Sequence, residues 1–133
     1  MSLPLDLKQA AQQVAQNAYV PYSDFPVGVA LRSADGRVFS GCNVENRSYP
    51  LGMCGERNAI GAAAAAGVRP GDITELVVYM PGDKLFSPCG GCRQAIAEFM
   101  PADGLVWACN DSERLKAWTA AELLPDGFSF DGL

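Results

Sequence analysis

The stretch CGERNAIGAAAAAG (54–67) predicts an alanine-rich helix over 54–66 that is stopped by Gly67. Alanine has the highest helix propensity, and glycine commonly follows the last helical residue. The apolar run ELVVYM (75–80) predicts a buried strand, and residues 89–100 predict another helix that ends before a proline. A strand between two helices is typical of a sheet with helices packed on its faces.

Working outward, the same patterns predict elements on both sides of this stretch. A helical periodicity precedes it, and a hairpin signal, Asp35-Gly36, separates two apolar segments. The expected helices cover 5–19 and 120–124, and the expected strands cover 27–31, 37–43, 105–109 and 115–118. No repeat or linker divides the chain, so residues 1–133 are expected to form a single domain. The order α-β-β-α-β-α-β-β-α predicts an α/β fold, with a mixed five-stranded sheet in a three-layer α/β/α arrangement.

Composition restricts the classes of function. The chain has 133 residues and a net charge of −5, and no run of basic residues is present to neutralise phosphates. A polynucleotide ligand is therefore disfavoured, and a small uncharged substrate fits better. No apolar stretch is long enough to span a bilayer, and the N-terminus does not resemble a signal peptide. With an odd number of cysteines, five, these features predict a cytoplasmic protein without a disulfide framework.

Three of the cysteines have the spacing of metal ligands in a chain that contains no histidine. Cys54 begins one expected helix, while Cys89 and Cys92 lie in the first turn of another. Helix N-termini favour thiolates, and zinc prefers sulfur ligands in tetrahedral geometry. Three ligands would leave one position for an activated water, and Glu56 would handle protons beside it. Arg57 would offset the excess negative charge of a three-thiolate site.

Spacing alone leaves other interpretations of these cysteines open. A closed structural zinc site would recruit Cys42 or Cys109 as its fourth ligand. Alternatively, Cys89 and Cys92 form a redox pair, or none of the thiols has a shared role. A closed zinc site or a redox pair would give a binding or redox module without hydrolytic activity.

Further motifs narrow the choice, because the chain resembles the small homotetrameric zinc-dependent cytidine deaminases. Cys54-x-Glu56 followed by Pro88-Cys89-x-x-Cys92 is similar to the zinc deaminase signature, in the branch where cysteine replaces the first histidine. Other similar segments, in chain order, are FPVG (25–28), GCNVEN (41–46), SYPLG (48–52), CGGCRQ (89–94) and ELLP (122–125). The resemblance implies hydrolytic deamination of cytidine and 2′-deoxycytidine in pyrimidine salvage, by a zinc-activated water with one Zn²⁺ per subunit.

The resemblance also implies individual roles. It implies zinc ligation by the three cysteines and proton transfer by Glu56. It further implies a small-molecule nucleoside substrate, active sites shared between the subunits of a homotetramer, and no polynucleotide or membrane partner. The implied substrate-binding residues, which include ribose, base and intersubunit contacts, are Phe25, Asn43, Glu45, Tyr49, Gly55 and Phe128.

The chain departs from the family pattern at a few positions. Gly55 stands where alanine is usual; it keeps the backbone N–H for the base carbonyl and is expected to remove a methyl from the pocket floor. Arg47 and Asn58 also replace the usual residues, as does Gly91. Because Arg47 and Gly55 lie near the substrate, a modified cytosine nucleoside or a nucleoside antibiotic is an alternative substrate.

Overall fold

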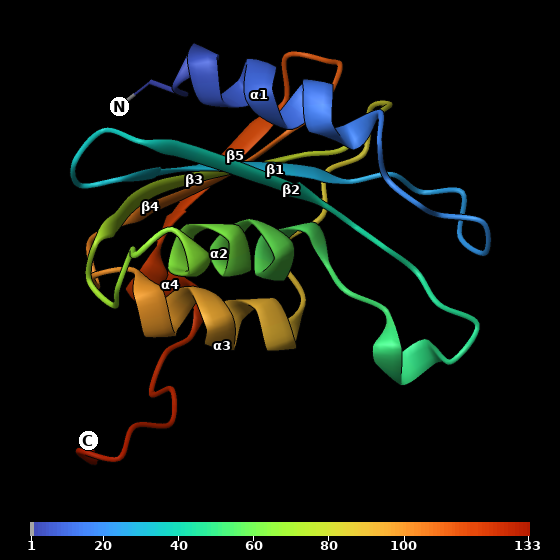
Figure 1. The fold of residues 1–133 in the computed structure, drawn as a ribbon. Coiled ribbons are helices and arrows are strands. Elements are labelled where there is room, and N and C mark those ends of the chain that lie inside the picture. The colour runs from blue at the N-terminus through green and yellow to red at the C-terminus, as the bar shows by residue number, and fades with distance from the viewer. Residues whose placement is uncertain (1) are drawn as a thin grey trace.

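A mixed five-stranded sheet forms the centre of the computed structural model, which describes residues 2–133 (Figure 1). The strands lie in the order β2-β1-β3-β4-β5, and β3 and β4 are the parallel pair. The other neighbouring strands are antiparallel. The predicted mixed sheet is therefore confirmed, with the strands β1 (Gly28–Ser33), β2 (Val38–Cys42), β3 (Ile73–Tyr79), β4 (Leu105–Cys109) and β5 (Leu115–Thr119).

Helices cover both faces of this sheet and complete the three predicted layers (Figure 1). Among residues 2–133, α1 (Leu5–Ala15) is the one helix on the first face. The opposite face carries α2 (Gly55–Ala65), α3 (Gly90–Phe99) and the short α4 (Ala120–Leu123). A short 3-10 helix, η1 (Tyr49–Leu51), lies between β2 and α2 and was not predicted. None of the helices in residues 2–133 is long and apolar enough to cross a membrane.

The first helix is shorter than the sequence predicts, and the end of β2 supplies the reason. The helix was expected to reach Tyr19 but ends at Ala15. The Tyr19 N–H donates to the Asn43 carbonyl at 3.0 Å, and the Glu45 N–H donates to the Tyr19 carbonyl at 2.8 Å. Because Tyr19 pairs with this extended segment, its backbone cannot also continue the helix.

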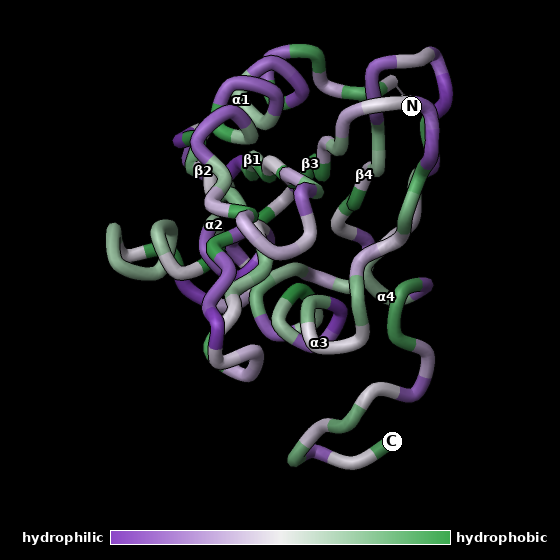
Figure 2. Tube along the Cα trace, turned by 90° about the vertical axis from the view of Figure 1, so that its right-hand side faces the viewer, coloured by the Kyte–Doolittle hydropathy of each residue, from purple (hydrophilic) through white to green (hydrophobic). Residues whose placement is uncertain are grey.

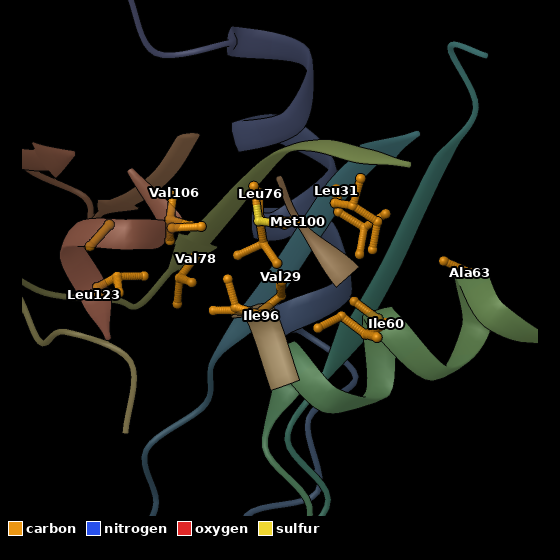
Figure 3. Packing of buried hydrophobic residues seen from close by; sticks show 14 of the residues in the cluster. Val29, Leu31, Ile60, Ala63, Leu76, Val78, Ile96, Met100, Val106 and Leu123 are labelled. Atoms are coloured by element: carbon orange, nitrogen blue, oxygen red, sulfur yellow. The ribbon is translucent and has the colours of Figure 1, made fainter. Parts of the chain in front are cut away.

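The larger hydrophobic core fills the space between the sheet and the helices α2, α3 and α4. Figure 3 shows Val29, Leu76 and Val78 of the sheet facing Ile60 of α2 and Ile96 of α3. A smaller core lies under α1, and the hydropathy colouring shows the apolar segments of the sheet between the helical layers (Figure 2). Packing on one sheet face holds α2 and α3 against each other. Their N-termini lie close together, because the sulfur atoms of Cys54 and Cys89, the residues immediately before the two helices, are 3.9 Å apart.

Two glycines permit close approach between the layers. A Cβ at Gly28 on β1 would lie 1.9 Å from the Ala11 carbonyl oxygen of α1. A Cβ at Gly41 on β2 would lie 2.4 Å from the Ala59 backbone nitrogen of α2. No flexible side chain can relieve either overlap, because both contacts are with backbone atoms.

Gly28→Ala is expected to destabilise the protein by about 3 kcal/mol or more, since α1 must move away from β1. Gly61→Ala is the matched control, because a Cβ at this position of α2 would meet no atom within 4 Å outside the adjacent residues and the nearby backbone of the helix itself. The control is expected to stabilise the helix by about 0.5–1 kcal/mol. Chemical denaturation measures both changes, and an equal effect of the two substitutions would contradict the packing argument.

Candidate active site

Three cysteines from two helix N-termini converge beneath one end of the sheet. Cys54 and Cys89 are the residues immediately before α2 and α3, and Cys92 lies in the first turn of α3. All three sulfur atoms lie within 4.8 Å of one another, and the Cys54 and Cys89 sulfurs are 3.9 Å apart. Within residues 2–133, neither Cys42 nor Cys109 belongs to such a cluster. The cluster can therefore hold one zinc ion without a fourth cysteine.

The charges around the sulfurs also fit zinc. A hydrogen bond with Cys92, supported by the Arg57 guanidinium, lowers the pKa of the Cys54 thiol to about 5. The same bond, together with burial, raises the pKa of Cys92. Arg57 Nη2 lies 4.0 Å from the Cys54 sulfur and donates to the Gly52 carbonyl at 3.2 Å. The Arg57 guanidinium thus stabilises the Cys54 thiolate. Its positive charge also offsets part of the excess negative charge that three thiolates would leave at a zinc site.

Glu56 lies beside this cluster in the first turn of α2 and is 5% exposed. Burial raises the pKa of its carboxyl group. A pocket of about 150 Å³, here called the central pocket, opens in front of it. The structure brings six residues singled out from the sequence to the wall of this pocket: Phe25, Asn43, Cys54, Gly55, Glu56 and Cys89.

The structure corrects the expected consequence of Gly55. A Cβ at this position would lie 3.0 Å from Val29 Cγ2 and 3.4 Å from the carbonyl oxygens of Val27 and Gly41. The missing methyl is therefore directed at the sheet and does not deepen the pocket floor. Glycine at this position accommodates the close approach of α2 to Val29.

Two polar residues hold the segment that leads into β1. The Asn43 amide accepts from the Val27 N–H and donates to the Phe25 carbonyl, both at 2.9 Å. The Glu45 carboxylate accepts from the Tyr22 N–H at 3.0 Å and from the Ser23 N–H and hydroxyl. Asn43 keeps a second amide hydrogen, and each carboxylate oxygen of Glu45 can accept further bonds.

Tyr49 and Phe128 do not line the central pocket of this chain. Tyr49 borders a separate hollow with Glu45 and packs edge-to-face on Tyr22, with ring centroids 6.3 Å apart. Phe128 packs on Phe130 in the C-terminal tail, which extends away from the body (Figures 1 and 2). Their side chains are 78% and 71% exposed, respectively.

Phe86 is a pocket residue that the sequence did not single out. It lies in the segment before α3, and its ring packs edge-to-face on Phe25 with centroids 5.5 Å apart. The only sequence signal for its role was its position, three residues before the zinc-ligand candidate Cys89. No periodicity links it to Phe25, because the two residues lie in separate irregular segments.

The segment that carries Phe86 is anchored by the turn after β4. The buried Asn110 donates to the Lys84 carbonyl at 3.1 Å. The Asp111 carboxylate accepts from the Gly82 N–H at 2.9 Å and from the Tyr79 hydroxyl. These bonds connect the sheet to the wall of the central pocket.

The Tyr79 contact predicts a pH dependence of stability. Burial and the Asp111 hydrogen bond raise the pKa of Tyr79 from 10.0 to about 12. Between these pH values the folded state keeps the proton that the unfolded state loses, so the free energy of unfolding falls as pH rises. Tyr79→Phe should show a shallower decline from pH 10 to 12 in denaturant titrations. Parallel curves for the two proteins would contradict this assignment.

A buried carboxyl group beside a three-sulfur metal site, in this fold, defines a zinc-dependent hydrolase. A sequence model of the cytidine and deoxycytidylate deaminase zinc-binding region matches residues 1–108. The chain belongs to this family of deaminases.

Similar proteins agree with this assignment over nearly the whole chain. A cytidine deaminase of Sporosarcina psychrophila is 42% identical over 123 residues, covering 92% of this chain and 89% of the relative. One from Mycobacterium tuberculosis is 38% identical over 127 residues, covering 96% and 90%. The 1.6 Å crystal structure of cytidine deaminase from Burkholderia pseudomallei has a TM-score of 0.90 and 42% identity, covering 96% of this chain and all of that one. The resemblance, the fold class and the zinc-dependent hydrolase class predicted from the sequence are confirmed.

Proposed function

We propose that the chain deaminates cytidine and 2′-deoxycytidine hydrolytically, giving uridine and 2′-deoxyuridine with release of ammonia, as a step of pyrimidine salvage. The observation that carries the proposal is the buried Glu56 carboxyl group beside the three-sulfur cluster, at the wall of the central pocket. Because burial raises the pKa of this carboxyl group, it holds a proton more readily than an exposed glutamate and can both accept and return one.

Cys54, Cys89 and Cys92 would hold the zinc ion. Bound zinc supplies a water of lowered pKa. Glu56 accepts a proton as the water oxygen bonds to C4 of the base, and it delivers that proton to ring N3. Glu56 then accepts the remaining proton of the hydroxyl group now on C4 and passes it to the amine, so that the C4–N bond breaks, the C4 carbonyl forms and ammonia leaves. Arg57 supports the Cys54 thiolate throughout and is a positioning residue.

The other pocket residues would bind and orient the nucleoside. The Gly55 N–H, at the start of α2, would donate to the base carbonyl, and Phe25 would contact the ring. The remaining amide hydrogen of Asn43 and the carboxylate of Glu45 would bind the ribose hydroxyls. Their bonds to the segment 22–27 hold both groups in place before substrate arrives.

A substrate panel tests the proposal. The decrease in absorbance on deamination would be followed for cytidine, 2′-deoxycytidine and several modified cytosine nucleosides, each with and without a zinc chelator. We expect zinc-dependent turnover of the first two. A value of kcat/KM for cytidine far below that for a modified analogue would instead assign a modified nucleoside as substrate. No turnover of any of them would support a non-catalytic zinc or redox module.

We further propose a homotetramer in which subunits share active sites. The exposed aromatic side chains of Tyr49 and Phe128 support this assembly, since large apolar groups in solvent are commonly covered by a partner. Phe128 would reach the central pocket of a neighbouring subunit. Light scattering measures the mass, and a monomer with full activity would contradict shared sites.

Residues 1–133 would act as one cytidine deaminase-like domain, because a single sheet carries both helices that supply the cysteines. A cytoplasmic location is supported by the five free cysteines, which a reducing compartment preserves.

A further inference from the structure

An aromatic pair forms one wall of the central pocket. Phe25 precedes β1 and Phe86 precedes α3, yet their ring centroids lie 5.5 Å apart with an angle of 85° between the planes. Both rings line the pocket together with the Ser87-Pro88 segment. The Phe86 side chain is 51% exposed, so it stands at the opening and not in the core.

Hydrogen bonds fix the backbone on both sides of this pair. The Phe25 N–H donates to the Ser23 hydroxyl at 3.1 Å, and its carbonyl accepts from Asn43. The Phe86 N–H donates to the Met80 sulfur at 3.2 Å, and the neighbouring Lys84 carbonyl accepts from the buried Asn110. With two anchored backbones and an edge-to-face contact, the rings form a wall that resists displacement.

The geometry of the reaction determines which edge of the base meets this wall. If N3 faces Glu56 and the carbonyl oxygen O2 faces the Gly55 N–H, that side of the ring is directed at the start of α2. The opposite edge, C5–C6, is then directed at the remaining apolar wall, where Phe25, Phe86 and the segment 87–88 lie together with Val27, Val78 and Met80. A substituent on C5 would have to fit against the aromatic pair.

We propose that Phe86 is a specificity-determining residue that closes the pocket over the C5 edge of the base and disfavours substituents at C5. This inference rests on the proposed deamination of cytidine. One methyl group in an apolar pocket typically changes kcat/KM by about tenfold or more. A shorter side chain in place of Phe86 would leave room beside Phe25 for a methyl group on C5.

The experiment compares cytidine with 5-methylcytidine in the wild-type protein and in Phe86→Val. We expect the ratio of kcat/KM for 5-methylcytidine to that for cytidine to rise about tenfold in the variant. For cytidine itself, KM should rise more than kcat falls, because Phe86 would contact the base away from the reacting atoms. Phe86→Leu, which retains more volume, should give an intermediate ratio.

Phe39→Val is the matched control. Phe39 lies on β2, packs against the larger core and does not line the central pocket. Thermal melting would establish that the variants are folded. A ratio that changes less than about twofold in Phe86→Val, or equally in Phe39→Val, would overturn the role of Phe86 while leaving the deaminase assignment intact. A folded, zinc-loaded wild-type protein that does not act on cytidine would overturn both proposals.

Discussion

Glu56→Gln is expected to lower kcat for cytidine by about 10²- to 10⁴-fold, the usual contribution of a general acid–base. Glutamine has nearly the same shape but cannot accept the proton from water or return it at N3. Zinc content should not change, because the metal cluster consists of the three cysteine sulfurs. Steady-state kinetics and atomic absorption on the same sample measure the two effects.

Glu98→Gln is the matched control for this substitution. Glu98 is exposed on α3, and its change is expected to leave both kcat and zinc content unaltered. If kcat of Glu56→Gln stayed within about tenfold of the wild-type value, the proton-transfer role of Glu56 would be contradicted. A tenfold loss is less than a general acid–base normally contributes. Loss of zinc from Glu56→Gln would show a structural defect instead.

Cys89→Ala is expected to abolish zinc binding and turnover together, because it removes one of three ligands. Metal binding also stabilises the fold. When the free zinc concentration is a thousand times the dissociation constant, binding adds about 4 kcal/mol to the free energy of unfolding. The wild-type melting temperature should therefore fall when a chelator removes zinc. The melting temperature of Cys89→Ala should be low from the start and should not respond to chelator.

Cys42→Ala provides the comparison within the same residue type. Cys42 lies outside the sulfur cluster, and the bond that it accepts from Asn58 uses its backbone carbonyl, which alanine retains. This variant should keep one zinc per chain and its response to chelator. Stoichiometric zinc in Cys89→Ala, or its loss from Cys42→Ala, would contradict the ligand assignment.

Local patterns predicted most of the fold, because the helices and strands are bounded by strong sequence signals. The strand Leu105–Cys109 has its expected bounds, and α3 ends just before Pro101 as predicted. Gly67 follows α2 with a φ of +99°, the conformation that glycine tolerates. The end of α1 was wrong because a tertiary backbone pairing at Tyr19 overrides local helix propensity.

The candidate site was predicted where its chemistry follows spacing along the chain. Cysteine and glutamate positions at two helix starts predicted the sulfur cluster and the adjacent carboxyl group. Phe86 was not predicted, because its meeting with Phe25 depends on how two irregular segments fold. The direction of the missing Gly55 methyl likewise depends on Val29, a residue of the sheet.

Reconstitution of the metal-free protein tests the central claim most directly. Uridine and ammonia would be measured from cytidine before and after stepwise addition of zinc. We predict no turnover without metal, full activity at one zinc per chain, and equal amounts of the two products. Full activity in the metal-free protein, or no uridine after zinc is bound, would contradict the assignment of this chain as a zinc-dependent cytidine deaminase.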